Sequence, residues 1–164
     1  MSGQDTARLT DTELWLWHAW KLAAENVRTR IAADITAATG LSDPDFGVLT
    51  RVSDTGRGRI RQNQLAESMG YHRSRLSHHL TRMEERGLIT REPAAGGVDV
   101  VITDSGREAV RQARPVHAAA VRQYLIGPVQ DTDWASFGQV LERLARPRPT
   151  ARAEGDRSDA PAAH

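Results

Sequence analysis

The sequence predicts a mostly α-helical protein with one small β-hairpin. Apolar residues recur at helical spacing along most of the 164-residue chain, and one short run, residues 98–102, is instead rich in β-branched side chains and follows a glycine-containing turn. The length suits one domain, or a small domain with appended helices, and is enough to bury a core. Each element can be placed in turn from its start and stop signals.

A long helix is expected first, over residues 12–39. Asp11 or Thr12 can cap its start, and Gly40 can end it in a left-handed conformation. A short second helix should begin after Ser42, whose hydroxyl oxygen can cap it.

The first helix carries an apolar stripe that is too wide for one neighbour. Trp15, Trp17 and Trp20 fall within six residues of its N-terminal end. Such a stripe suggests packing against the helix's own subunit and against a second one. The tryptophans either line a ligand cavity or fill an interface, and Phe46, from the short helix, is the fourth candidate for contact with a ligand.

Residues 62–86 read as two short helices joined by a tight turn. The first spans residues 62–69 and ends at Gly70, and the second spans residues 72–86 and ends at Gly87. The second helix has an inward stripe and an outward, mostly hydrogen-bonding face. The inward residues are Leu76, Leu80 and Met83; the outward ones are Ser74, His78, Thr81 and Arg82, with Arg75 and Ser77 on the flanks. A helix of this kind suits a DNA major groove.

Positive charge gathers around these two helices. Residues 51–91 hold nine arginines against four acidic residues, a net charge of +5, whereas the whole chain has a net charge of only +1. A basic patch on one part of a chain is typical of nucleic-acid binding, although an arginine-rich solvated surface has the same composition.

A β-hairpin should follow directly. Residues 88–91 and 98–102 read as strands, and residues 93–97 as the turn between them. The order helix-turn-helix and then hairpin is that of a winged helix, whose wing can reach the sugar–phosphate backbone or the minor groove.

The C-terminal part returns to helices. Thr103 can cap a helix that continues to about residue 126, with a bend expected at Pro115. Thr132 can cap a last helix. We expect residues 1–11 to be flexible and residues 147–164, which are rich in proline, alanine and charge, to be a disordered tail.

Over residues 12–146 the sequence resembles the MarR (multiple antibiotic resistance regulator) family of winged-helix transcription factors. Four fragments in the family's order and spacing carry the resemblance. They are Gln64-Leu65-Ala66 with Met69-Gly70-Tyr71, Arg73-Ser74-Arg75-Leu76-Ser77, Met83-Glu84-Glu85-Arg86-Gly87-Leu88-Ile89, and Ile102-Thr103-Asp104-Ser105-Gly106.

The resemblance implies an obligate homodimer. Residues 12–40 and 103–146 would form the dimerisation helices, and residues 42–102 the winged-helix DNA-binding lobe. Each lobe would meet one half of a palindromic operator. A small effector, often phenolic or aromatic, would bind between platform and lobe and change the lobe spacing, so that the lobes no longer match successive major grooves.

The candidate DNA contacts follow from the outward face. Arg75 is the first candidate for a guanine contact, because its planar fork can engage two acceptors on one base. Ser74, Ser77 and His78 could reach base edges or phosphates, whereas Gln62, Asn63, Arg73 and Arg82 should contact the DNA backbone.

The wing departs from the family pattern. Family wings commonly carry Asp-x-Arg or Asp-Arg-Arg, but the turn here has no arginine, and none follows Asp99. We therefore expect a smaller contribution from the wing, with Arg91 at its base as the one obvious cation.

Other function classes find less support. The sequence has no cysteine, no phosphate-binding loop and no evident catalytic arrangement, so it does not read as an enzyme, and no cofactor is expected. His72, His78 and His79 could contribute to a zinc site in a metal-responsive regulator, but we expect them at the surface or facing DNA. A dimeric winged-helix scaffold acting through protein contacts is the other alternative.

No apolar run suits a membrane span or a signal peptide, so a cytoplasmic protein is expected.

Overall fold

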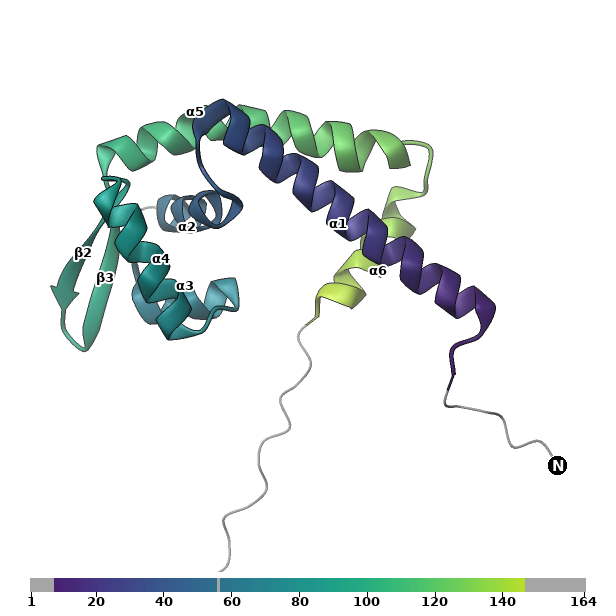
Figure 1. The fold of residues 1–164 in the computed structure, drawn as a ribbon, viewed down its shortest axis with the longest axis horizontal. Helices are drawn as coiled ribbons and strands as arrows, with labels where there is room; N and C mark the ends of the chain where they lie inside the picture. Colours follow the sequence, from purple (N-terminus) through teal and green to yellow (C-terminus); the bar gives the residue numbers. More distant parts are fainter. Residues whose placement is uncertain (1–7, 56, 147–164) are drawn as a thin grey trace, which may run out of the picture. The chain divides into compact units, whose positions relative to one another are not determined.

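The computed structural model describes residues 8–55 and 57–146 (Figure 1). The helices are α1 (Asp11–Thr39), α2 (Asp43–Asp54), α3 (Gln62–Met69), α4 (Arg73–Glu85), α5 (Asp104–Val121) and α6 (Trp134–Ala145). The strands are β1 (Arg59–Arg61), β2 (Ile89–Ala94) and β3 (Gly97–Ile102). The predicted class, mostly helical with a β-hairpin wing, is confirmed.

The chain divides into two compact units, residues 1–129 and residues 130–164. The first unit contains every element up to and including α5, and α6 belongs to the second. The flexible N-terminus and the disordered tail that the sequence predicts fall mostly on residues 1–7 and 147–164, which lie outside the described residues.

Two helices begin one residue away from the predicted caps. Thr10, rather than Asp11 or Thr12, caps α1, because its hydroxyl accepts from the Glu13 N–H while the Glu13 carboxylate accepts from the Thr10 N–H at 2.8 Å. In α6 the cap is Asp133 rather than Thr132.

The hairpin has longer strands and a shorter turn than predicted. β2 and β3 pair from Ile89↔Ile102 to Ala94↔Gly97, so only Ala95 and Gly96 join them. Gly96 has a φ of 80°, the positive value that a two-residue turn requires, and glycine adopts it without steric cost. Pro93 is compatible with β2 because the sheet order β1-β3-β2 leaves β2 at an edge, where a missing N–H breaks no ladder.

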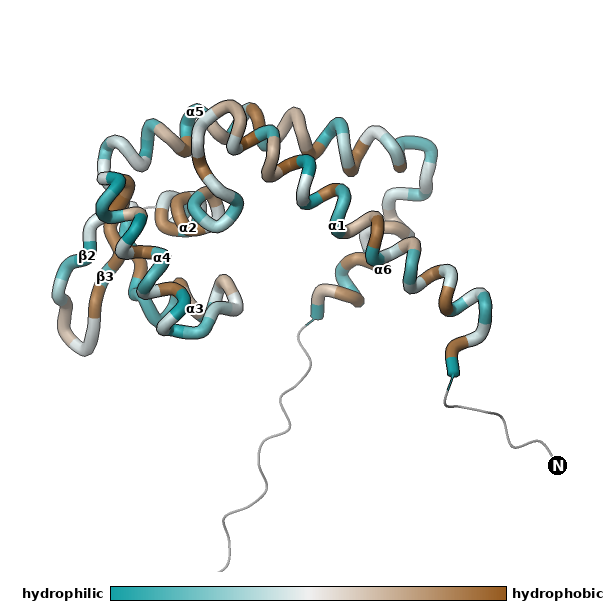
Figure 2. The backbone as a smooth tube through the Cα atoms, viewed as in Figure 1, coloured by the Kyte–Doolittle hydropathy of each residue, from teal (hydrophilic) through white to brown (hydrophobic). Residues whose placement is uncertain are grey.

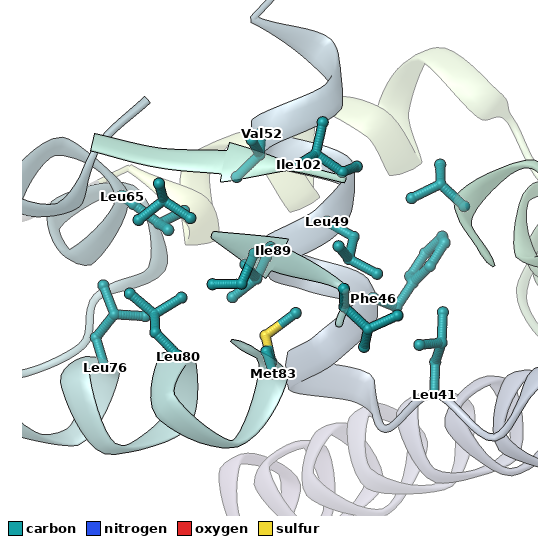
Figure 3. Packing of buried hydrophobic residues seen from close by; sticks show 14 of the residues in the cluster. Leu41, Phe46, Leu49, Val52, Leu65, Leu76, Leu80, Met83, Ile89 and Ile102 are labelled. Carbon is teal, nitrogen blue, oxygen red and sulfur yellow. The ribbon is translucent and has the colours of Figure 1, made fainter. Parts of the chain in front are cut away.

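A single apolar core holds the first unit together (Figure 3). The inward stripe predicted for α4 is confirmed, and its three residues are fully buried against α2 and the sheet. The other large members of the core are Ile35, Leu41, Phe46, Val48, Leu49, Val52, Leu65, Leu88, Ile89, Val100, Ile102 and Val110. The core therefore lies under α4 and fixes which side of that helix faces outward.

The two long helices of the first unit contribute less to this core. α1 packs along α5, but Ile35 near its C-terminal end is its only fully buried residue. In Figure 2 hydrophobic and hydrophilic residues alternate along the N-terminal half of α1. Several of its large apolar side chains are exposed, and Trp15 is 68% exposed. α5 continues through Pro115 to Val121 and is followed by a π-helical segment, Arg122–Ile126, which the apolar spacing did not predict.

Gly106 in the first turn of α5 allows that helix to approach the end of α4 closely. A Cβ atom at Gly106 would lie 2.1 Å from the Leu88 carbonyl oxygen and 2.8 Å from a side-chain carbon of Ile102. We expect Gly106→Ala to lower the free energy of unfolding by about 1–3 kcal/mol, because backbone must shift to make room. Urea denaturation followed by circular dichroism measures this.

Gly47→Ala in α2 is the matched control. An added Cβ there meets only the ends of Arg51 and Met69, at 3.4 Å and 3.5 Å. Alanine should be neutral or stabilising at this position, since it favours helix over glycine. Equal effects of the two substitutions would contradict the close packing at Gly106.

Candidate nucleic-acid interface

The outward face of α4 carries most of the side chains that the sequence assigned to it. Arg73, Ser74, Arg75, His78 and Arg82 are exposed, whereas Ser77 and Thr81 are half-buried. This division follows from the helical repeat, since Leu76, Leu80 and Met83 occupy the opposite side. The exposed face therefore offers three guanidinium groups, a hydroxyl and an imidazole from one helix.

The turn before α4 also positions Arg75. Gly70 ends α3 in a left-handed conformation, with a φ of 64°, and the chain then places Tyr71 beside α4. The Arg75 guanidinium lies over the Tyr71 ring, 4.5 Å from its centroid. This cation–π contact restricts the long side chain while leaving its in-plane N–H donors available to a partner.

His79 is not at the surface, and the expectation that it would be exposed or face DNA is wrong. Its exposed fraction is 8%, and its Nε2 lies 3.1 Å from the Asp45 carboxylate. The contact lacks the alignment of a hydrogen bond and is electrostatic. The spacing contained the signal: residue 79 is three after Leu76 and four before Met83, which places it on the buried stripe.

Asp45 joins the far end of α4 to two other helices. Asp45 is only 3% exposed. Its carboxylate accepts a hydrogen bond from the Ser42 N–H at 3.0 Å, which completes the cap of α2. It also accepts one from Arg86 Nη1 at 2.7 Å. Arg86 also donates to the Gly40 carbonyl, at the end of α1, at 3.1 Å. The sequence reasoning missed this Asp45 junction, although an Asp three residues after Ser42 fits a capping box.

Both titratable groups of the Asp45 junction have lowered pKa values, but burial favours this shift only for His79. Burial lowers the pKa of the His79 imidazole below its ordinary value, and the neighbouring Asp45 carboxylate opposes this without reversing it. Burial alone would raise the pKa of Asp45, but hydrogen bonds from Ser42 and Arg86 outweigh it and hold that pKa below its usual range.

Arg91 is not a free cation at the base of the wing. Its Nε and Nη2 donate to Glu84 Oε2 at 2.9 Å and 2.7 Å, and its backbone N–H donates to Glu84 Oε1 at 2.8 Å. These bonds lower the pKa of the Glu84 carboxyl. Arg91 therefore fastens β2 to α4, and its charge is already paired.

Other arginines lie on the sheet instead. Arg59 and Arg61 extend from β1 and pair with Glu92 and Asp99 of the hairpin, so Arg91 is not the one cation near the wing. The sequence did not reveal these two ion pairs, because they form only when β1 lies beside β3 in the sheet.

Of the remaining candidates for DNA contact, Gln62 is half-buried at the start of α3 and Asn63 is exposed.

Comparison with known proteins identifies this arrangement. Residues 39–97, which span the lobe from α2 to the wing, match the model of the MarR family. The structure is similar to AbsC, a MarR family transcriptional regulator from Streptomyces coelicolor, with 29% identity, a TM-score of 0.77, and coverage of 84% of this chain and 93% of that one. The winged-helix lobe of the chain therefore matches the MarR family.

Two further structures are informative. Another MarR family transcriptional regulator from Streptomyces coelicolor, solved in complex with DNA, is 28% identical, with a TM-score of 0.78 and coverage of 84% of this chain and 92% of that one. An organohalide-sensing transcriptional regulator in its 2,4-dichlorophenol-bound form is 17% identical, with a TM-score of 0.70 and coverage of 88% and 85%, and shows a shared fold. No curated protein matches the chain.

The four candidate ligand contacts do not line one hollow. Trp20 borders a hollow along α1 together with His18 and Arg28. Phe46 belongs to the core and borders a second hollow, between α2 and α5, where its ring centroid lies 5.1 Å from that of His117. Trp15 and Trp17 are exposed on α1.

Neither a metal centre nor a membrane segment is evident in the described part of the chain. No three histidine, aspartate or glutamate side chains gather there as metal ligands would. His78 and His79, adjacent in sequence, point to solvent and to Asp45 respectively. None of the described helices is both long enough and apolar enough to cross a membrane.

The buried histidine should make the protein acid-sensitive. The folded protein binds fewer protons at His79 than the unfolded chain does, so this group's stabilisation is complete above pH 6.5 and declines as the pH falls below that value. Asp45 adds a further loss only below pH 3.8. We expect the free energy of unfolding to fall as the pH is lowered below about 6.5.

His79→Gln should flatten this part of the stability profile, because glutamine is polar but does not titrate. His78→Gln, one residue away and exposed, should leave it unchanged. Guanidinium denaturation at a series of pH values measures both. A profile as steep in His79→Gln as in the wild type would show that another group causes the acid sensitivity.

Proposed function

We propose that the chain is a ligand-responsive, sequence-specific transcriptional repressor that binds a palindromic operator as a homodimer. One observation carries the proposal. The basic, hydrogen-bonding face of α4 is exposed while its apolar stripe is buried, in a lobe of MarR family architecture. The DNA complex of a relative with 28% identity supports the same use of the lobe.

The residues divide by the kind of DNA contact we assign to them. Arg75, held over Tyr71, would contact a guanine through its planar fork. Ser74, Ser77 and His78 would reach base edges or phosphates. Arg73, Arg82, Gln62 and Asn63 would contact the backbone; Arg91 acts indirectly, since Glu84 holds its guanidinium.

The uncovered stripe of α1 supports the homodimer. Large apolar side chains gathered on one exposed helix mark an interaction site, and a two-fold symmetric partner would cover them. The stripe consists of Leu14, Trp15, Leu16, Trp17, Trp20 and Leu22, and Leu9, just before the helix, is exposed as well. Two lobes related by two-fold symmetry would then read a palindromic site.

An aromatic effector is the ligand class we assign. The hollow between α2 and α5 places the Phe46 and His117 rings near the Arg51 guanidinium, so it offers stacking and hydrogen-bond donors. Its charges balance, because Asp43 and Asp54 also line it and Asp54 pairs with Arg114. A phenol or aromatic acid matches that chemistry. The 2,4-dichlorophenol complex of a regulator with the same fold is consistent with this class.

Selection of bound sequences from random DNA, followed by titration of the purified protein with the selected duplex, tests the proposal. A steep loss of affinity with rising salt indicates binding through phosphates. A scaffold that acts only through protein contacts would select no sequence. Release of DNA by aromatic acids, but not by zinc, would favour the aromatic effector over a metal-responsive regulator.

Arg75→Ala should weaken binding to the selected site by about 1–3 kcal/mol and relax the preference at one base position. Arg73→Ala is the comparison: it should weaken binding to all sequences alike and reduce the salt slope by about 1, as expected for a phosphate contact. Titrations against the selected duplex and single-base variants measure both. Unchanged sequence preference in Arg75→Ala would show that this arginine does not read a base.

Trp15→Glu should dissociate the dimer, because it places a charge in the apolar stripe of α1. Sedimentation should then move from twice the mass of the 18.1 kDa chain toward the monomer. Gln64→Glu, on the exposed side of α3, adds the same charge outside the stripe and should leave the mass unchanged. A wild-type monomer at micromolar concentration would contradict the homodimer.

A further inference from the structure

The tip of the wing has little support of its own. The last β1–β3 pair is Arg61↔Asp99, and beyond it β2 and β3 form a two-stranded ribbon with pairs Pro93↔Val98 and Ala94↔Gly97. Residues 93–98 carry no charged side chain, and four of the six are alanine or glycine. A two-stranded ribbon with so few side-chain contacts is only marginally stable by itself.

Arg61 supplies a contact at this tip. Its Nη2 donates to the Ala95 carbonyl at 2.8 Å, and its Nη1 lies 3.2 Å from Asp99 Oδ1. The Ala95 contact is a hydrogen bond, whereas the Asp99 contact is an ion pair without hydrogen-bond alignment. The side chain is 36% exposed, and that of Asp99 is 17% exposed, so this pair is partly shielded from water.

Arg61 also stands at the start of the helix-turn-helix. It is the last residue of β1 and the N-cap residue of α3, yet its side chain makes no capping bond to that helix. The side chain instead extends over the hairpin. One residue therefore connects the first helix of the DNA-binding motif with the turn of the wing.

We propose that Arg61 is a positioning residue that sets the wing tip relative to the helix-turn-helix, so that both meet DNA together. The inference rests on the proposed DNA-binding function. Arg61 acts through Ala95 and Asp99 and not by touching DNA, because its two terminal nitrogens already face those acceptors. The small tip residues can then lie close to the DNA backbone without a side chain in the way.

The first measurement is made on the free, full-length protein. Amide hydrogen exchange of the segment 94–98 should be faster in Arg61→Ala than in the wild type, while exchange in α4 stays unchanged. Arg61→Lys should lie between the two, since an ammonium keeps the charge but lacks the planar fork. Arg59→Ala is the matched control: Arg59 lies on the same strand and pairs with Glu92, which precedes the tip and lies outside the segment whose exchange is measured.

The second measurement uses the DNA duplex obtained by selection. Arg61→Ala should raise the Kd about three- to tenfold, the range expected for a partly exposed ion pair with one charge-assisted hydrogen bond. Hydroxyl-radical protection should be lost only at the flanks reached by the wing, and base preferences should be retained. The salt slope should not change, because the wing tip carries no cation and the substitution removes none that contacts a phosphate. Arg59→Ala should bind within about twofold of the wild type.

The outcomes separate the two proposals. If the wing tip of Arg61→Ala exchanges its amide hydrogens at the wild-type rate, the positioning role is overturned. The same holds if Arg61→Ala binds DNA with the affinity and footprint of the wild type. A salt slope reduced by about 1 with an unchanged tip also overturns it, since Arg61 would then contact a phosphate directly. If the wild type and all variants alike bind no DNA, the proposed function itself fails, and the positioning role with it. Thermal melting by circular dichroism identifies any variant that does not fold, in which case Arg61→Lys replaces Arg61→Ala.

Discussion

Burial of the apolar stripe of α4 is the constraint on which the rest of the structure depends. Leu76, Leu80 and Met83 fill the core beneath the helix, and rotating the helix by one residue would expose all of them. The cost of exposing three large apolar side chains is several kcal/mol, which no surface contact of the helix matches. The outward direction of Ser74 and Arg75 is therefore a consequence of packing beneath them.

Polar contacts then fix the helix along its axis. Asp45 binds Arg86 and faces His79, so the C-terminal part of α4 is joined to α2 and to the end of α1. Glu84 joins the same part to β2 through Arg91. These charges lie at one end of the helix and are paired within the protein, while the guanidiniums of Arg73 and Arg75 are left on its exposed side. The arginines that are paired within the protein thus differ from those that we assign to DNA contact.

The wing and α1 each depend on a surface outside themselves. The wing has small residues at its tip and receives support from β1, so its placement depends on a residue outside the hairpin. α1 gives only its C-terminal end to the core, through Ile35, and leaves Trp15 and its neighbours uncovered. A lobe that is complete in one chain is therefore combined with a helix that needs a further surface to cover it.

The order of elements, the inward stripe of α4 and the exposed basic face could all be predicted from the sequence, because helical periodicity and turn residues are local properties. The sequence also contained the spacing that buries His79, although a histidine on a stripe is easily assigned to the surface. Only the tertiary structure decided which arginines are paired. Glu84 and Arg91 lie on different elements, Asp45 and Arg86 are 41 residues apart, and Arg61 and Ala95 are 34 apart. No local pattern specifies such pairs, because strand order and helix packing bring them together.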